Sequence, residues 1–480
     1  MNRNNIFIHI GIAVVLITLA AVMGQIRRWE NSLQSARSTS TDSVRTLPKS
    51  VERVTDRGEP EVLVRFKAGV GLDEIRKIAA HNNDLMEDEI ESVKGLVSID
   101  DLDNANAEAT AEEYSAMSDL VEYAHPNYEI RLDPNEDVGT PSRKDLVYRE
   151  SSGKPNDPEF DSQWALNNLG QDGGRERADI DALQAWLKTR GSEKIVVAVL
   201  DSGVDYTHKD LVSNMWLRPD NLPQYADDEL GTFDDLHGFD ADTNAGDPMD
   251  DNGHGTHCAG IIGAEGDNGE GIAGINWNVS IMPLKFLGRG GFGTTKNAIE
   301  AINYAIDRKQ KGVNVRVINA SWGSTQYSKA LEDAIRAAGE QGILFVAAAG
   351  NSSTDNDKRA HYPSNYDLPN VISVAAMDRT DSITSFSNFG VKTVHIAAPG
   401  RDILSTWLKN SYREASGTSM AAPQVSGVAA LILASEPGLS VDKLRERLLG
   451  SVDKLDALPG KVSTGGRLCA GQALGIKDSH

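Results

Sequence analysis

Short, wholly apolar runs alternate with stretches of helical periodicity from about residue 153 to residue 475. Residues 195–200 and 343–349 contain only aliphatic, aromatic and alanine side chains, which is typical of parallel strands buried on both faces. Residues 424–435 are small and mostly apolar, and are long enough for a buried helix. This alternation predicts an α/β fold in which helices cover both faces of a mainly parallel sheet.

A different pattern precedes this region. Ile6 to Met23 is an apolar run between arginines, so residues 1–26 are predicted to be a signal peptide that is cleaved on export or, as the alternative, an uncleaved membrane anchor. Residues 27–59 are polar and predict a linker. Residues 60–131 show a β-α-β-β-α-β order, which predicts a small two-layer α+β unit. Residues 132–152 carry Pro, Gly, Ser and charges without periodicity, and predict an exposed, cleavable linker.

Composition narrows the classes of function. The 480 residues exceed one ordinary domain, and 40% of them are hydrophobic, which is enough for a large core. The net charge of −22, from 70 acidic against 48 basic residues, argues against nucleic-acid binding. The chain has neither a His-Glu-x-x-His motif nor paired Cys-x-x-Cys motifs, so a zinc site is not expected.

The stretch Ser-Gly-Thr-Ser-Met-Ala-Ala-Pro at residues 416–423 predicts a catalytic nucleophile at the start of a helix. Ser419 would lie where free backbone N–H groups and the positive helix end favour a developing negative charge. Pro423 suits a first helical turn, where its missing N–H costs nothing. The alternative is an ordinary Ser/Thr helix cap, so the residues upstream must decide between the two.

A serine hydroxyl needs a base to remove its proton, and only His480 follows Ser419. The base must therefore precede the serine, which excludes the order Ser, acid, His of the α/β-hydrolases and disfavours orders that begin with His. An esterase is also disfavoured because the Gly-x-Ser-x-Gly motif is missing. The remaining common order is Asp, His, Ser.

Asp201 follows the 195–200 strand, at the edge where open α/β sheets hold their sites. His254 is flanked by glycines at the head of a predicted helix, and Asn351 follows the 343–349 strand, where its amide can donate to an oxyanion. Each residue alone has an ordinary explanation as a strand-end cap, a structural histidine or a turn. Together they predict an active site, and they disfavour a non-catalytic scaffold that kept the fold.

Four motifs carry a resemblance to a known family: Asp201-Ser202-Gly203, His254-Gly255-Thr256-His257, Ala349-Gly350-Asn351 and Gly417-Thr418-Ser419-Met420-Ala421. Their sequence and order resemble those of the subtilisin-like serine proteases, or subtilases, and residues 156–160 and the His-Cys pair at 257–258 are most similar to the thermitase branch. The resemblance implies a three-layer fold and an exported serine endopeptidase, secreted or retained at the cell envelope. Ser419 would be its nucleophile, His254 its base, Asp201 the group that orients the base, and Asn351 an oxyanion donor.

The resemblance also implies a cleft that binds an extended peptide substrate by β-augmentation. Its substrate-binding residues would be Ser321, Trp322, Gly323, Gly290, Phe292, Ala348 and Gly350. The ordinary alternatives are turn glycines and a core tryptophan. His361 falls where the family has small residues at the base of the S1 pocket, which puts the broad apolar preference of the family in question for this chain.

Calcium is the cofactor that the resemblance implies, because hard cations take oxygen ligands. The expected site uses the side chains of Asp157, Asp210 and Asn268 and the carbonyls of Glu265, Glu270 and Ile272. A second group precedes the catalytic histidine and is either another ion site or a solvated acidic loop: Asp240, Asp242, Asn244, Asp247 and Asp250. The acidic residues at 227–229 and 234–235 are a weaker candidate.

Residues 60–131 resemble the subtilase propeptide, an intramolecular chaperone and inhibitor, in their position and in their Val121–Tyr128 ending. The chain would then be a self-inhibited zymogen, with Val121–Tyr128 in the cleft as a product-like strand. The alternative is a small interaction domain that stays in the mature protein. Of the two cysteines, Cys258 is expected to be a buried thiol beside the active helix, although their count does not exclude a disulfide with Cys469.

Overall fold

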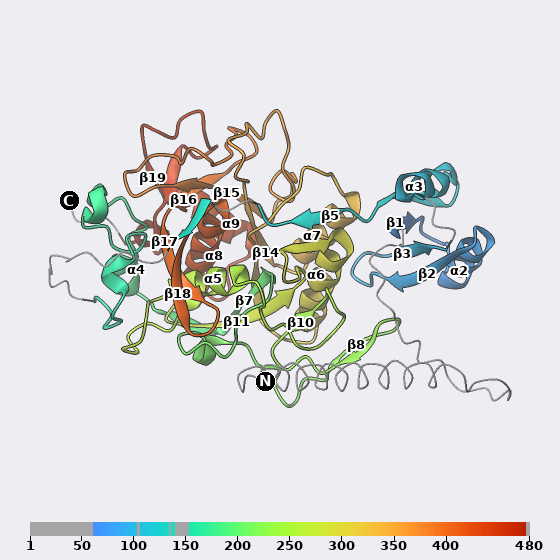
Figure 1. Cartoon of the computed structure of the whole chain (residues 1–480), viewed down its shortest axis with the longest axis horizontal. Coiled ribbons are helices and arrows are strands. Elements are labelled where there is room, and N and C mark those ends of the chain that lie inside the picture. Colours follow the sequence, from blue (N-terminus) through green and yellow to red (C-terminus); the bar gives the residue numbers. More distant parts are fainter. Residues whose placement is uncertain (1–60, 103–105, 134–135, 140–152, 477–480) are drawn as a thin grey trace, which may run out of the picture. The chain divides into compact units, whose positions relative to one another are not determined.

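The computed structural model describes residues 61–102, 106–133 and 153–476, together with the backbone of residues 136–139 (Figure 1). The predicted signal peptide or anchor and the predicted linker 27–59 lie outside the described residues, as does most of the linker 132–152.

The N-terminal unit has the predicted β-α-β-β-α-β order. Its elements are β1 (Glu61–Phe66), α2 (Leu72–His81), β2 (Asp84–Glu89), β3 (Leu96–Asp101), α3 (Ala107–Ala116) and β4 (Val121–Pro126). The strands form an antiparallel sheet in the order β2-β3-β1-β4. Ile75 and Ala79 of α2 and Ala111 and Tyr114 of α3 share a buried core with the apolar residues of the sheet. The unit therefore has two layers and a core of its own.

The central sheet has nine strands and is parallel except at one edge. In spatial order they are β10 (Phe239–Asp240), β11 (Asn278–Lys285), β7 (Gly191–Asp201), β13 (Val315–Ala320), β14 (Leu344–Ala348), β15 (Val371–Met377), β16 (Ile396–Pro399), β20 (Gly466–Leu468) and the antiparallel β19 (Val452–Lys454) (Figure 1). Every residue of β13, β14 and β15 is buried, which explains why their sequences lack polar alternation.

Helices cover both faces of this sheet. Successive residues of β7 point to opposite faces, so Val197 and Val199 join one core and Ala198 and Leu200 join the other. The first core contains α5 (His254–Gly263), α8 (Thr418–Ser435) and part of α9 (Val441–Gly450), together with the short helices α4 (Ala182–Trp186) and α10 (Ala470–Ala473). The second contains α6 (Thr295–Gln310) and α7 (Lys329–Glu340). The predicted three-layer α/β fold is confirmed.

Within the described part of the chain, α8 is the helix that is long and apolar enough to cross a membrane, but 89% of it is buried inside the fold. Its apolar character is therefore explained by its place at the centre of the first core. Short 3-10 turns at Phe160–Ser162, Gln171–Gly173 and Val212–Asn214 and a hairpin of β8 (Tyr225–Asp227) and β9 (Gly231–Phe233) complete the surface.

The chain leaves the N-terminal unit along the edge of the larger one. Strand β5 (Glu129–Arg131) pairs antiparallel with β12 (Phe292–Thr294), and Arg131 forms a bridge with Gly323 on the opposite side. The backbone N–H of Leu132 then donates to the Gly291 carbonyl at 2.9 Å. Residues 129–132 therefore lie between two backbone edges that belong to distant parts of the sequence.

This segment corrects two predictions. Val121–Tyr128 does not lie between the edges, because residues 121–126 are needed to pair with β1 and complete the small sheet. The linker 132–152 is also not uniformly irregular, since β6 (Glu136–Gly139) pairs with β18 (Ser411–Ser416), which in turn pairs with β17 (Ile403–Trp407). Both pairings join residues that are distant in sequence, and local patterns do not reveal such contacts.

Candidate active site

Asp201 and His254 meet where a strand ends and a helix begins. Asp201 is the last residue of β7 and His254 is the first of α5. Nδ1 of His254 lies 2.8 Å from Oδ1 of Asp201, and the same oxygen accepts the backbone N–H of Ser202 at 2.7 Å. Nε2 of His254 is buried and has no hydrogen-bond partner among the described residues. This arrangement fixes the ring by one nitrogen and leaves the other available for a proton.

The charges around His254 favour its protonated form. Burial alone would lower the pKa of this imidazole, but the Asp201 carboxylate opposes it, and Asp250 and Asp133 add to the effect, so that the pKa is raised above 6.5. His254 can therefore take a proton and hold it as an imidazolium beside Asp201.

Asp250 accepts hydrogen bonds from the residues at the start of α5. The sequence predicted a possible ion site for this residue and did not predict this contact. Its Oδ1 accepts hydrogen bonds from the backbone N–H groups of Asn252 and Gly253 and from Ser202 Oγ, each at 2.9 Å. Its Oδ2 accepts from the backbone N–H and the hydroxyl of Thr256, at 3.0 and 2.6 Å. Asp250 thus links the segment after Asp201 to the helix that carries His254. Asp250 lies four residues before the first residue of α5, and an acidic residue just ahead of a helix start is the sequence signal for such a contact.

Ser419 is the second residue of α8. Its hydroxyl donates to the carbonyl of Ser321 at 2.9 Å. Pro423 lies in the second turn of α8 rather than in the predicted first turn, and it has no N–H to give to the Ser419 carbonyl four residues earlier. That carbonyl accepts instead from Ser321 Oγ at 2.8 Å and from Cys258 Sγ at 3.5 Å. The proline therefore frees a carbonyl that ties the nucleophile segment to β13 and α5.

Asn351 faces the same helix start with one end of its amide. Its Oδ1 accepts the backbone N–H of Thr418 at 2.8 Å and the Thr418 hydroxyl at 2.9 Å. Because a backbone N–H can only donate, the oxygen must face Thr418, which leaves Nδ2 turned away. That Nδ2 is buried and has no partner among the described residues. The active centre therefore holds a hydroxyl, a base with a free nitrogen and an unused amide donor, which are the groups that acyl transfer requires.

The neighbouring histidine and the cysteines have other tasks. His257 is fully enclosed, and burial lowers its pKa to about 3, so it stays neutral beside the Arg413 carbonyl at 3.1 Å. Cys258 and Cys469 are both buried and unpaired, as expected, and burial raises the pKa of the Cys258 thiol well above its usual range. The Cys258 thiol therefore fills space beside α8.

Some of the predicted cleft residues lie along the backbone edges of the cleft, whereas the side chain of Trp322 lies in the core. Gly323 bridges to Arg131, and the ring of Phe292 lies 4.7 Å from the guanidinium of Arg131. The side chain of Trp322 instead lies in the core, where Nε1 donates to the Leu200 carbonyl at 2.9 Å. Gly291 and Gly293 also contact residues 129–132, but neither was predicted as a cleft residue from the sequence. The signal was present, because both belong to the glycine-rich run 288–293 at this edge.

The remaining predicted cleft residues lie close to these edges. Ala348 is buried in β14, and the backbone N–H of Gly350 donates to the Thr418 hydroxyl at 3.0 Å. A side chain at Gly290 would meet the ring of Phe292 at 2.6 Å. Ser321 contributes its carbonyl to the Ser419 hydroxyl.

The predicted calcium ligands are gathered around Asp210. Its Oδ1 accepts from the Asn268 amide at 2.9 Å, and its Oδ2 accepts from the Ile272 N–H at 2.9 Å. The Glu265 N–H donates to the Asp210 carbonyl at 2.8 Å, and the Glu270 N–H donates to Asn268 Oδ1 at 2.8 Å.

Asp157 approaches the same loop from the start of the domain. Its Oδ2 accepts from the Asp267 N–H at 2.7 Å, whereas its Oδ1 is buried without a partner among the described residues. Burial, together with the Asp157 carboxylate, raises the pKa of Asp210 to about 6. Paired buried carboxylates with an unused oxygen fit a hard cation.

The other acidic groups are used within loops. Asp240 accepts from the backbone N–H groups of Asp242 and Thr243, and Asp247 accepts from the Tyr206 hydroxyl at 2.9 Å. In the 234–235 pair, Asp235 accepts from the Tyr304 hydroxyl at 2.8 Å and forms a fully buried ion pair with Arg308 at 3.2 Å.

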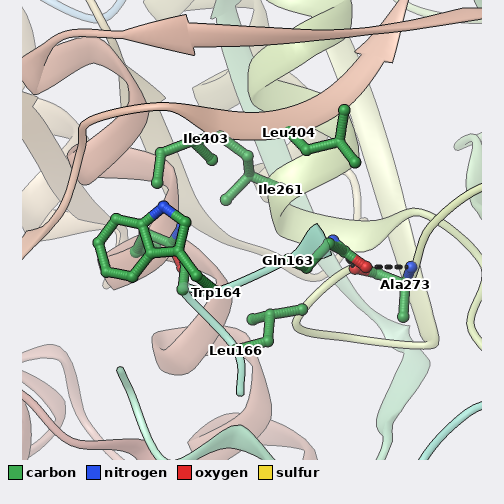
Figure 2. A pocket seen from close by; sticks show the side chains of 9 residues that line it. Gln163, Trp164, Leu166, Ile261, Ala273, Ile403 and Leu404 are labelled. Atoms are coloured by element: carbon green, nitrogen blue, oxygen red, sulfur yellow. Dashed lines mark hydrogen bonds between the residues drawn. The ribbon is translucent and has the colours of Figure 1, made fainter. Parts of the chain in front are cut away.

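A small pocket lies between the start of the domain and α5 (Figure 2). Trp164, Leu166, Ile261, Ile403 and Leu404 give it mainly apolar walls, and none of Asp201, His254 or Ser419 lines it. Gln163 accepts the Ala273 N–H at 2.9 Å and donates to its carbonyl at 2.8 Å, so it fixes the chain just after the loop at 265–272. The pocket is part of how this loop is anchored.

Comparisons with known proteins agree with this geometry. The model of a family described as the subtilase family matches residues 192–465. The thermophilic serine proteinase of Bacillus sp. (strain AK1) is 34% identical over 425 residues, which cover 87% of this chain and 89% of that protein.

Two solved structures are also similar. Fervidolysin from Fervidobacterium pennivorans, described as a keratinolytic enzyme related to subtilisin, matches with a TM-score of 0.67 and 26% identity, over 87% of this chain and 61% of that one. The chain thus spans about three fifths of that structure. A protease from Pseudoalteromonas arctica PAMC 21717 matches with a TM-score of 0.55 and 28% identity, over 67% of this chain and 99% of that one.

Proposed function

Since the chain belongs to the subtilase family and is a serine-type endopeptidase, we propose that Asp201, His254 and Ser419 carry its reaction and that residues 61–133 hold it as a self-inhibited zymogen. The observation that carries the proposal is a pair of unused groups, one on the first residue of α5 and one on Asn351, which contacts the start of α8. Nε2 of His254 and Nδ2 of Asn351 are both buried without a partner among the described residues. Buried groups of this kind are costly unless a ligand or a transition state uses them.

The reaction follows from these positions. A peptide substrate extends between the Gly291–Gly293 edge and Gly323, and Ser419 Oγ attacks its carbonyl carbon while Nε2 of His254 takes the hydroxyl proton. Asp201 holds the other ring nitrogen and stabilises the imidazolium. The oxyanion receives hydrogen bonds from Asn351 Nδ2 and from the Ser419 backbone N–H. His254 then gives its proton to the leaving amine, and water repeats the sequence on the acyl-enzyme.

Self-inhibition is supported by contacts of the N-terminal unit with the surface helices of the larger one. Asn127 Oδ1 and the Tyr128 carbonyl accept the first N–H groups of α6, from Lys296 at 2.8 Å and from Thr295 at 2.9 Å. His125 Nε2 accepts the N–H of Ala330 in the first turn of α7 at 3.2 Å. These acceptors satisfy helix ends that would otherwise lack partners, and the following segment fills the cleft.

The decisive experiment compares the wild-type chain with Ser419→Ala by mass spectrometry after secretion. Wild type is expected to lose the N-terminal unit by a cut in residues 132–152, and to react with phenylmethylsulfonyl fluoride at Ser419. Ser419→Ala is expected to remain joined and inactive. An active enzyme whose amino terminus maps upstream of Glu61, or labelling of another serine, would contradict the proposal.

Calcium is the cofactor we propose for the Asp157–Asp210 site. The side chains of Asp157, Asp210 and Asn268 and the carbonyls of Glu265, Glu270 and Ile272 would hold it. A bound cation would neutralise two buried carboxylates and fix the loop at 265–272. It would act on stability, because no residue of the catalytic group belongs to this set.

Export is proposed from the sequence of residues 1–26, as a secreted or cell-envelope enzyme. The apolar run Ile6–Met23 is the observation behind it. Cell fractionation with amino-terminal sequencing distinguishes a cleaved signal peptide from an anchor.

A further inference from the structure

The register of the segment in the cleft identifies the residue that faces the nucleophile. Arg131 is paired antiparallel with Gly323, so the next facing pair in this register is Asp133 and Ser321. The Ser321 carbonyl is the one that accepts the Ser419 hydroxyl. The Asp133 carboxylate is also near enough to His254 to contribute to its raised pKa. Asp133 therefore occupies the P1 position, that of the residue whose carbonyl the enzyme attacks.

His361 lies beside Asp133, where the floor of a pocket for the P1 side chain would be. A Cβ added to Gly323 would lie 2.0 Å from His361 Cε1, and one added to Gly350 would lie 3.0 Å from His361 Cδ2. The imidazole is therefore held between the backbones of two glycines, in the space that the side chain of a large P1 residue would need. Only a short P1 side chain would therefore fit above the imidazole.

The floor also carries the partner of the Asp133 carboxylate. His361 Nε2 lies 3.3 Å from Asp133 Oδ2, and the two side chains are only 8% and 16% exposed. Neither atom has a hydrogen-bond partner elsewhere among the described residues. The other ring nitrogen of His361 lies 3.5 Å from Ser364 Oγ. Among the described residues, His361 Nε2 is thus the nitrogen that lies within 4 Å of the Asp133 carboxylate.

From this arrangement we propose that His361 makes the enzyme select a short acidic side chain, aspartate, at P1 of its peptide substrates. A carboxylate can accept a hydrogen bond from Nε2 of His361, whereas an apolar side chain would leave a buried ring nitrogen without a partner. An aromatic side chain would meet the imidazole. The inference rests on the proposed function, since it describes the pocket of the same active site.

The test uses peptides that copy residues 130–132, Ile-Arg-Leu-X, with a fluorogenic leaving group and X as Asp, Asn or Phe. The full chain is expressed, allowed to become active, and titrated with phenylmethylsulfonyl fluoride to count active sites. We expect kcat/KM for Asp to exceed that for Asn by roughly tenfold to a hundredfold, the scale of a hydrogen bond to a charged group. Phe is expected to be poorer than Asp.

His361→Gln and His361→Gly are the matched variants. Both should lose the preference for Asp over Asn, and His361→Gly should in addition cleave the Phe peptide faster than wild type does. Each preference is a ratio of two kcat/KM values measured on one enzyme sample. A misfolded fraction lowers both values equally and leaves the ratio unchanged. An unchanged Asp-to-Asn ratio in His361→Gln, or a wild type that prefers Phe, would overturn the inference. Failure of wild type to cleave any peptide or to react with the inhibitor would instead contradict the proposed function.

Discussion

Asn351 presents the two ends of its amide to different partners, and this separates its structural task from its chemical one. Its oxygen holds Thr418 at the start of α8, while its nitrogen remains free for the oxyanion. Asn351→Leu should lower kcat roughly a hundredfold or more with little change in KM, the scale known in subtilisin itself for losing one such donor. Asn351→Asp keeps an acceptor for Thr418 but replaces the donor with a carboxylate oxygen, which repels the oxyanion, so its loss of kcat should be at least as large. Steady-state kinetics that place the loss in KM would mean that Asn351 binds substrate.

The two histidines of α5 offer a matched comparison at the same scale. His254→Ala should reduce kcat by about six orders of magnitude, the scale known in subtilisin itself for loss of the base, and should stop covalent labelling of Ser419. His257→Gln should still react with the inhibitor, because His257 is neutral and contacts the Arg413 carbonyl rather than the nucleophile. Labelling that depends on His257 but survives in His254→Ala would reverse the assignment.

The fall of activity at acidic pH is also set by a single residue, His254. The base works only when it is neutral, and the carboxylates around His254 raise its pKa above 6.5. The kcat/KM of the enzyme should therefore rise with pH through a midpoint above 6.5, because protons leave His254 only there. A midpoint well below 6.5 in peptide hydrolysis would show that burial outweighs the carboxylates.

At the scale of elements, the loop at 265–272 is where a cation should change stability. Without an ion, burial raises the pKa of Asp210 to about 6, above its value in the unfolded chain. The stability from this group is then fully present below about pH 3.9 and is lost as pH rises through about 6. Calcium needs the ionised carboxylate, so the melting temperature in calcium minus that in chelator should grow from pH 5 to pH 7.

The magnitude and control of this prediction follow from linkage. Free calcium about a hundredfold above its Kd adds about 2.7 kcal/mol to the folded state. Asp210→Asn should remove the calcium effect on melting while peptide hydrolysis by the folded enzyme remains. A variant that melts like wild type in both calcium and chelator would remove this site from consideration.

Elements also show what local sequence can and cannot predict. The run ending at Asp201 predicted a buried strand with a carboxylate at its edge, because burial on both faces leaves a continuous apolar pattern. The orientation of Trp322 was not predictable, since a bond to the Leu200 carbonyl, far away in sequence, turns its ring into the core. The choice of 129–133 over 121–128 for the cleft likewise depends on which strand β1 pairs with. Competition between distant partners is decided by the whole fold.

At the scale of the whole molecule, several carboxyl groups gather where the N-terminal unit meets α6, and Asp88 and Glu300 among them are buried. Burial raises the pKa of Glu61 and Asp88 on the unit and of Glu300 on α6, and it raises the pKa of Glu91 to about 7. The groups facing them are Lys296, Glu87, Arg76, Glu229 and Asp227. His125 of β4, which contacts the first turn of α7, acts in the opposite direction, because burial lowers its pKa.

These shifts predict that the N-terminal unit binds more weakly as pH rises. The docked carboxyl groups hold protons that free ones release above about pH 4.5, so docking is favoured at low pH and weakens up to about pH 7. Asp333 of α7 also opposes this trend, because Lys329, Tyr123 and Arg65 lower its pKa despite burial. The four carboxyl groups outnumber these two opposing groups. The Ser419→Ala chain, cut by an added protease in residues 140–152, should release the unit faster at pH 8 than at pH 5 on size exclusion. Glu300→Gln should flatten the dependence, and release that accelerates on acidification would contradict it.

The hydrogen bond from Ser419 to the Ser321 carbonyl has a consequence for the order of events in turnover. The same carbonyl is the next acceptor along the edge that pairs with Arg131, and a carbonyl oxygen can accept two hydrogen bonds. The hydroxyl keeps this bond even with residues 129–133 in the cleft, so occupation of the edge does not by itself move it. The first event of turnover is therefore a rotation of the Ser419 side chain away from the edge that binds the substrate and towards His254.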